Sequence, residues 1–296
     1  ILTLLLYKMG LSEQKVNIGG TILVDDGLIN FEIIDINGKD IICKVLNDGV
    51  IKNHKGVNVP NVSINLPSVT EKDKDDLVFG CKMGVDFVAA SFIRKASDIK
   101  EIRDLLNKNN GKNIQIIAKI ESQEGVNNID SILEVADGIM VARGDMGVEI
   151  PIEKVPIIQK KIIKKCNEAG KIVITATQML DSMIRNSLPT RAEACDICNA
   201  IFDGTDAIML SGESASGQYP IEAANTMSKI AKETELHLDY NYLNQRLKEP
   251  AMYDFAEAIS YSTCRTSNVL NAKAIVAATN SGATAKLVSK YKPKCP

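Results

Sequence analysis

Residues 114–145 read IQIIAKIESQEGVNNIDSILEVADGIMVARGD, and this stretch decides the fold. An apolar run over 114–120 is followed by an amphipathic segment over 122–135 and by a second apolar run over 138–142. Short, nearly continuous apolar runs are typical of strands that are buried on both faces, and the segment between them has helical spacing. The stretch therefore predicts a strand, a helix and a second strand parallel to the first.

The same alternation continues on both sides of this stretch and gives five strand–helix units in all. The expected strands are 85–91, 114–120, 138–142, 172–176 and 207–210. The expected helices are 96–107 with Ser97 as its N-cap, 122–135, 152–169 ending at Gly170, 190–202 and 221–234. Strands that alternate with helices in this way predict an α/β fold with a parallel sheet.

The flanking segments have different patterns. Residues 1–58 predict a small antiparallel β module with strands at 21–24, 28–35 and 41–46, because Asn37-Gly38 between two β-rich runs is a strong hairpin signal. Residues 236–250 are typical of a linker. Another α/β unit would then begin, with a helix over 252–264, a strand over 274–278, a polar turn over 279–284 and a helix over 285–290.

The composition excludes several classes of protein. The 296 residues hold 35 Lys and Arg against 37 Asp and Glu, so the chain is no strongly basic binder of nucleic acid or anionic membranes. It has no apolar run of transmembrane length, and the apolar start lacks the features of a secretory signal. The seven scattered cysteines indicate reduced thiols. Cys195 and Cys198 are interpreted as two buried or partly buried thiols, with a zinc or redox site as the alternative.

Polar side chains follow the expected strands, where function gathers in parallel βα folds. Lys119 and Glu121 are two positions apart, so they share one side of a strand that continues through Glu121. Asp145 follows the next strand, and two carboxylates with substrate oxygens and waters suit Mg²⁺. Lys119 could then neutralise a transferring phosphoryl group or a developing enolate. The alternatives are a solvated Lys–Glu pair and a simple turn in which Asp145 caps a helix.

The remaining strand ends carry weaker signals. Of Thr175 and Thr177, one is expected to face the site at the carboxyl ends of the strands, which would be the mouth if the sheet closes into a barrel, and the other to pack or cap. Ser211 and Glu213 could open the next helix. Residues 279–284 are rich in hydroxyls and could hold a phosphate, although many βα loops have this composition. Both ends of the sequence look cut from a longer chain, since it does not begin with Met and starts inside an apolar run.

Several longer runs strongly resemble the pyruvate kinase family, in the same order over nearly the whole chain. These runs are 24–29 (VDDGLI), 90–96 (ASFIRKA), 117–121 (IAKIE), 140–151 (MVARGDMGVEIP), 176–180 (ATQML), 189–193 (PTRAE) and 209–213 (MLSGE). The resemblance implies a (β/α)8 TIM barrel with an inserted β lid and a C-terminal α/β domain. It places residues 1–58 in the lid, 59–238 in the last five βα units of the barrel and 239–296 at the start of the C-terminal regulatory domain.

The resemblance also implies an activity, which is Mg²⁺- or Mn²⁺-dependent phosphoryl transfer from phosphoenolpyruvate to ADP, giving pyruvate and ATP in glycolysis. Carried over residue by residue, Lys119 stabilises the transition state, and Glu121 and Asp145 hold the metal. Gly144 and Asp145 receive the substrate carboxylate at a helix N-terminus. Thr177 lies beside the reacting carbon and assists the proton step at the enolate.

More peripheral roles follow from the same resemblance. Lys55 matches a nucleotide-contacting lysine, and Thr279, Ser281 and Thr284 match positions that hold an effector's phosphate in regulated members. Asn280 and Ala283 stand where some members have basic residues, which argues against sugar-phosphate activation. Family members are usually cytoplasmic homotetramers.

The family's first barrel strands, which supply a substrate-binding Arg, the K⁺ ligands and further nucleotide contacts, are absent from the sequence. We therefore expect an open barrel edge and little activity from this chain alone. Two alternatives remain, which are a barrel of the citrate lyase and malate synthase type and a non-catalytic barrel that serves as a binding partner. The lid-like segment and the 176–180 run argue against the first, and the presence of Lys119, Glu121 and Asp145 argues against the second.

Overall fold

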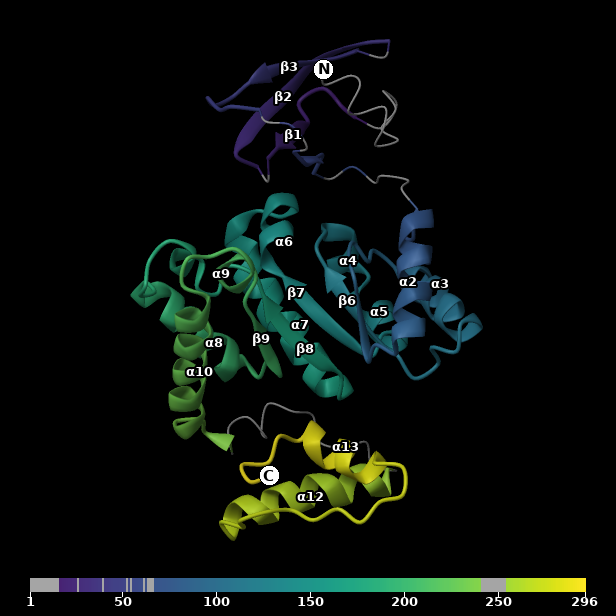
Figure 1. The fold of residues 1–296 in the computed structure, drawn as a ribbon, viewed down its shortest axis with the longest axis vertical. Coiled ribbons are helices and arrows are strands. Elements are labelled where there is room, and N and C mark those ends of the chain that lie inside the picture. Colours follow the sequence, from purple (N-terminus) through teal and green to yellow (C-terminus); the bar gives the residue numbers. More distant parts are fainter. Residues whose placement is uncertain are drawn as a thin grey trace. The chain divides into compact units, whose positions relative to one another are not determined.

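The computed structural model describes residues 16–25, 27–38, 40–51, 53, 55–60, 62, 67–240 and 254–296. Predictions that concern residues 1–15 or 241–253 lie outside the described residues. Figure 1 shows the fold as a ribbon coloured along the chain. The chain divides into two compact units, one formed by residues 1–136 with 141–158 and the other by 137–140 with 159–296. No described helix is both long and apolar enough to cross a membrane.

The β module of the first unit is a four-stranded antiparallel sheet in the order β3-β2-β1-β4. Its strands are β1 (Thr21–Val24), β2 (Ile29–Asn37), β3 (Asp40–Val45) and β4 (Val57–Asn58). The predicted hairpin is confirmed, since Asn37 pairs with Asp40 and Gly38 takes the positive φ of 60° that the turn requires. Alternate side chains such as Ile22, Ile33 and Phe31 form the core of this module.

The rest of the first unit begins the predicted βα alternation, and β5 pairs with β6 in parallel. Its elements are α2 (Glu71–Met83), β5 (Phe87–Ala90), α3 (Ala96–Lys108), β6 (Gln115–Ile120), α4 (Gln123–Asn127), α5 (Ile129–Val135), α6 (Arg143–Glu149) and the 3-10 turn η2 (Ile152–Lys154). β6 is largely buried, as expected for a strand covered on both faces.

The second unit continues the alternation, and β8 pairs with β9 in parallel. The further elements are β7 (Gly138–Ala142), α7 (Val155–Ala169), β8 (Ile172–Ala176), η3 (Asp181–Ile184), α8 (Arg191–Asp203), β9 (Ala207–Met209), α9 (Gly212–Ala215), α10 (Pro220–Leu236), α12 (Phe255–Val269) and α13 (Ala283–Lys290). The residues of β7 and α7 are divided between the two units. The strand order β5-β6-β7-β8-β9 confirms the five predicted strands, and the pairs β5–β6 and β8–β9 are parallel as predicted.

Four features of the helices differ from the prediction. Helix α2 was not predicted because it is polar and buries no residue; its capping box of Thr70 and Asp73 was the available signal. The predicted helix over 122–135 is interrupted at Asn128, and the one over 152–169 opens with the turn η2. Ser97 is not the N-cap of α3. That position is Lys95, whose backbone N–H donates to the Asp98 carboxylate.

The strand predicted over 274–278 is wrong. These residues are assigned to no strand, and the backbone hydrogen bond seen there joins Ile275 N–H to the Pro296 carbonyl at 2.8 Å. A strand exists only where a neighbour continues the ladder, and an apolar run cannot reveal whether that neighbour is present. Next to this segment α12 packs on α13 through Cys264, Val288 and Tyr291.

Helix α8 begins with a capping box that also holds the preceding turn η3. The Glu193 carboxylate accepts hydrogen bonds from Ser182 N (2.7 Å), Ser182 Oγ (2.6 Å), Thr190 N (2.7 Å) and Thr190 Oγ1 (3.0 Å). Partial burial raises the pKa of Glu193, but these hydrogen bonds outweigh it and hold the pKa below its ordinary value of 4.5. The carboxylate form therefore stabilises the folded chain.

We expect Glu193→Ala to lower the free energy of unfolding at neutral pH by about 1–2 kcal/mol, the scale of a lost helix cap. A carboxylate with a lowered folded pKa contributes stability above its unfolded pKa, and this stability is lost as the pH falls through the folded pKa. The difference from the unmodified protein should thus shrink in acid. Urea unfolding at neutral and at acidic pH measures it, with the exposed Glu134→Ala as control. An equal difference at both pH values would contradict the assignment.

Candidate active site

Lys119 and Glu121 form an ion pair at the carboxyl end of β6. The Lys119 ammonium lies 2.7 Å from Glu121 Oε1, so the two side chains meet on one side as predicted, although β6 ends at Ile120 and Glu121 is the first residue after the strand. The Glu121 side chain is only 1% exposed and that of Lys119 23% exposed. The alternative of a solvated surface pair is therefore wrong for the carboxylate, which is buried, and partial burial strengthens the attraction between the two charges.

The end of the neighbouring strand β5 supplies a second partner to each member of the pair. Lys119 Nζ donates to Ser91 Oγ at 2.8 Å, and the backbone N–H of Phe92 donates to Glu121 Oε2 at 2.5 Å. In the sequence, Ser91 and Phe92 stand at the carboxyl end of the first expected strand, where function gathers, and in a run similar to the family. Neither pattern assigned them a role, because the partners of a strand end depend on the neighbouring strand.

Asp145 lies in the first turn of α6 and is electrostatically coupled to Glu121. Burial raises the pKa of Glu121 above its ordinary value of 4.5, the hydrogen bonds and the charge from Lys119 and Phe92 oppose this, and the negative charge of Asp145 raises it further. The Asp145 carboxylate therefore lies close enough to Glu121 for its charge to act on that residue, which the sequence analysis expects for the ends of neighbouring strands.

Two carboxylates next to each other fit a divalent cation that takes its other ligands from substrate and water. No group of three or more His, Cys, Asp or Glu side chains able to hold a metal occurs in the part of the chain that the structure describes. A metal at Glu121 and Asp145 would therefore need ligands other than a third described His, Cys, Asp or Glu side chain. A substrate phosphate and carboxylate have oxygens that could serve as such ligands.

Thr177 and Thr175 have separate roles in the second unit. Thr175 is fully buried and its hydroxyl lies 3.0 Å from Thr205 Oγ1, so it is the one that packs. Thr177 follows the end of β8, donates to the Ala176 carbonyl at 2.6 Å and has a φ of 68°; Gln178 has a φ of 55°. A positive φ is an outlier for a β-branched residue, and such strain gathers at functional sites.

The peripheral candidates lie in other surroundings. Lys55 pairs with Asp25 of its own β module at 2.7 Å. Thr279 Oγ1 accepts from Gly282 N (3.1 Å) and Ser281 Oγ from Ala283 N (3.4 Å), while Thr284 lies in the first turn of α13. The hydroxyls of Thr279 and Ser281 therefore accept from backbone amides at the start of α13, whose N-cap is Gly282.

Two further interpretations need correction. Glu213 does more than open α9, because its buried carboxylate also accepts from Leu180 N at 3.0 Å and from Ser211 N at 2.8 Å. It therefore ties α9 to the segment that follows β8. Cys195 is exposed, whereas the sequence analysis expects it to be at least partly buried.

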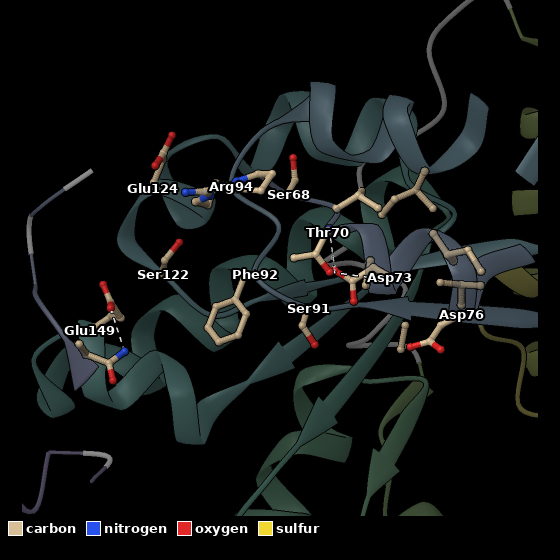
Figure 2. A pocket seen from close by; sticks show the side chains of 18 of the residues that line it. Ser68, Thr70, Asp73, Asp76, Ser91, Phe92, Arg94, Ser122, Glu124 and Glu149 are labelled. Carbon is tan, nitrogen blue, oxygen red and sulfur yellow. Dashed lines mark hydrogen bonds between the residues drawn. The ribbon is translucent and has the colours of Figure 1, made fainter. Parts of the chain in front are cut away.

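A cavity of about 1250 Å³ adjoins the end of β5 in the first unit (Figure 2). Ser91, Phe92 and Arg94 line it together with Glu149 of α6 and Asn58 of β4. The Asn58 side chain donates to Glu149 Oε1 at 3.2 Å, and burial raises the pKa of Glu149. The β module thus contacts the short helix that carries Asp145.

Residues 4–224 match the family model of the barrel domain of pyruvate kinase, and residues 257–296 match that of its alpha/beta domain. These matches define the class as α/β barrel proteins with a second α/β domain. The chain is 68% identical to a pyruvate kinase of Clostridium perfringens over 285 residues and 62% identical to one of Clostridium acetobutylicum over 283 residues. Each alignment covers 96% of this chain and 60% of the relative.

A crystal structure of a pyruvate kinase from Cryptosporidium parvum superposes with a TM-score of 0.90 at 44% identity. It covers 97% of this chain, which spans 60% of that structure. The chain belongs to the pyruvate kinase family, as the motifs predict. The chain holds the match to the barrel domain and part of the C-terminal α/β domain.

Proposed function

We propose that the protein that contains this chain transfers the phosphoryl group of phosphoenolpyruvate to ADP and yields pyruvate and ATP. The observation that supports this most directly is the Lys119 ammonium, held between Ser91 and the buried Glu121 next to Asp145. A fixed cation beside two carboxylates is suited to phosphoryl transfer, whose transition state is stabilised mainly by positioned positive charge.

Each residue of the group has a distinct task in the proposed reaction. The Lys119 ammonium neutralises charge on the phosphoryl oxygens as the bond to the enolate oxygen breaks. Glu121 and Asp145 are the ligands of Mg²⁺ or Mn²⁺, which supplies Lewis-acid stabilisation of the same charge when bound. Because the Glu121 carboxylate is buried, solvent screens the ion pair less than it would screen a pair on the surface.

The remaining assignments are proposals that rest on the family. Gly144 and Asp145 bind the substrate carboxylate, Thr177 assists protonation of the enolate, and Lys55 contacts the nucleotide. The strands β5 to β9 are the last five of eight in the barrel, the β module is part of the lid, and K⁺ ligands come from the family's first strands. The complete protein is a cytoplasmic homotetramer. An effector phosphate at Thr279, Ser281 and Thr284 is the weakest proposal, because two of these hydroxyls already accept from backbone amides at the start of α13.

The test is an assay of the full-length protein for pyruvate and ATP. We expect both products in equal amounts, only when phosphoenolpyruvate, ADP and Mg²⁺ are all present, and far less product from residues 1–296 alone. Consumption of phosphoenolpyruvate without ATP would favour an enolate-handling barrel of another type. A full-length protein that binds these ligands without turnover would favour the non-catalytic alternative.

A further inference from the structure

We propose that Ser91 and Phe92 are positioning residues of the active site: the Ser91 hydroxyl fixes the Lys119 ammonium, and the Phe92 backbone amide fixes the Glu121 carboxylate. Both residues belong to the segment between β5 and α3, here called the 91–95 loop. The expected effect on catalysis rests on the proposed function. The way in which the Lys119 ammonium and the Glu121 carboxylate are held does not depend on it.

The charged pair is held from two sides, since one set of contacts comes from the end of β6 and the other from the loop that follows β5. Lys119 Nζ has one partner on its own strand end, Glu121 Oε1 at 2.7 Å, and one on the loop, Ser91 Oγ at 2.8 Å. Glu121 Oε2 receives the Phe92 amide at 2.5 Å. Two partners in different directions restrict the position of a flexible ammonium group, whereas a single partner would leave it able to rotate. The loop contacts therefore determine the position of the positive charge.

The backbone at Phe92 is in an unusual conformation. Its φ of 54° lies in the left-handed region, which bulky residues rarely adopt, and its side chain is 58% exposed. Burial of the aromatic ring therefore does not account for the conformation. The gain comes instead from the amide, which in this conformation meets the carboxylate of Glu121.

The rest of the loop is held on several sides, which keeps Phe92 in this conformation. Ile93 is fully buried, and a Cβ added at Gly125 of α4 would lie 2.7 Å from the Ile93 carbonyl oxygen. Asn128 donates to the Arg94 carbonyl at 2.8 Å. The buried Asp98 accepts from Arg94 N at 3.0 Å and from the next amide at 3.1 Å. These contacts hold the backbone at residues 93–95 and so restrict the adjoining Phe92, as a positioning element requires.

The first experiment separates positioning from substrate binding. We expect Ser91→Ala in the full-length protein to lower kcat by about 10-fold, the scale of one hydrogen bond to a charged group, with little change in KM for phosphoenolpyruvate. Ser91→Thr keeps a hydroxyl and should restore most of kcat. Ser262→Ala, an exposed serine of α12, is the matched control and should leave both parameters unchanged.

The second experiment reads the Glu121 contact without turnover. Electron paramagnetic resonance gives the affinity of the substrate-free protein for Mn²⁺. Phe92→Pro removes the N–H and excludes a positive φ, so we expect Mn²⁺ binding at least about 10-fold weaker, as for a lost partner of a metal ligand. Phe92→Gly keeps the N–H and adopts the same φ without strain, and should bind Mn²⁺ like the unmodified protein.

The outcomes distinguish the inference from the proposed function. Unchanged kcat in Ser91→Ala, or a raised KM with unchanged kcat, would overturn the role of Ser91. Equal Mn²⁺ affinities for the proline and glycine variants would overturn the role of the Phe92 amide. A protein that produces no pyruvate would refute the proposed function, while the Mn²⁺ measurement would still decide how Glu121 is held. Thermal unfolding of each variant checks its fold.

Discussion

Lys119→Met is expected to lower the kcat of the full-length protein by at least about 100-fold, the scale of losing one preorganised electrostatic group. Methionine keeps the unbranched shape of the side chain but removes the ammonium that lies 2.8 Å from Ser91 Oγ and 2.7 Å from Glu121 Oε1. Because the charge matters most in the transition state, phosphoenolpyruvate binding should change far less than kcat. Steady-state kinetics and equilibrium binding measure the two separately.

The control for this variant is Lys100→Met, which removes an exposed ammonium from α3 and should leave kcat unchanged. Affinity for Mn²⁺ should not fall in Lys119→Met, because losing a neighbouring positive charge favours a cation at Glu121. A kcat within a few-fold of the unmodified protein would show that Lys119 does not stabilise the reaction. Weakened metal binding with an intact fold would count against the shared site.

Glu121→Gln is expected to weaken Mg²⁺ or Mn²⁺ binding by at least about 10-fold and to raise the metal concentration needed for turnover. Glutamine has nearly the same shape and can still accept the Phe92 amide, so the change removes mainly the charge. Because burial raises the pKa of Glu121 above 4.5, protons should compete with the metal at a higher pH than for an exposed carboxylate. Calorimetric metal titration over a range of pH values tests both effects.

Glu134→Gln, which neutralises an exposed carboxylate of α5, is the matched control and should bind the metal normally. If Glu121→Gln binds Mg²⁺ as tightly as this control, Glu121 is not a ligand. If Glu121→Gln binds Mg²⁺ more weakly but its binding depends on pH as in the unmodified protein, the proton that competes with the metal binds to a group other than Glu121.

The strands were predictable because each has a simple physical origin in the sequence. A strand covered on both faces must be apolar throughout, and the runs at 114–120 and 138–142 satisfy this over nearly their whole length. Helix α2 buries no residue and therefore needs no apolar face, so its sequence has no hydrophobic pattern that would predict a helix. The run at 274–278 shows the converse: it has the composition of a strand but is not in one.

The charged site was only half predictable. Spacing along one strand placed Lys119 beside Glu121, and the order of strand ends brought Asp145 near them. The Ser91 and Phe92 contacts depend on the register between β5 and β6 and on a positive φ at a bulky residue. Neither property is encoded in local composition. The role of Asp98 was missed for a related reason, because the neighbouring Ser97 is the more usual capping residue.

The crowding around the 91–95 loop has a consequence for how this protein can change over time. Asp98, Gly125 and Asn128 come from three different helices or their junctions and act on the same few backbone atoms. A replacement at one of them alters what the other two can tolerate, so their mutational effects should not add. We therefore expect lineages of this protein to alter these three positions rarely, and then in compensating combinations.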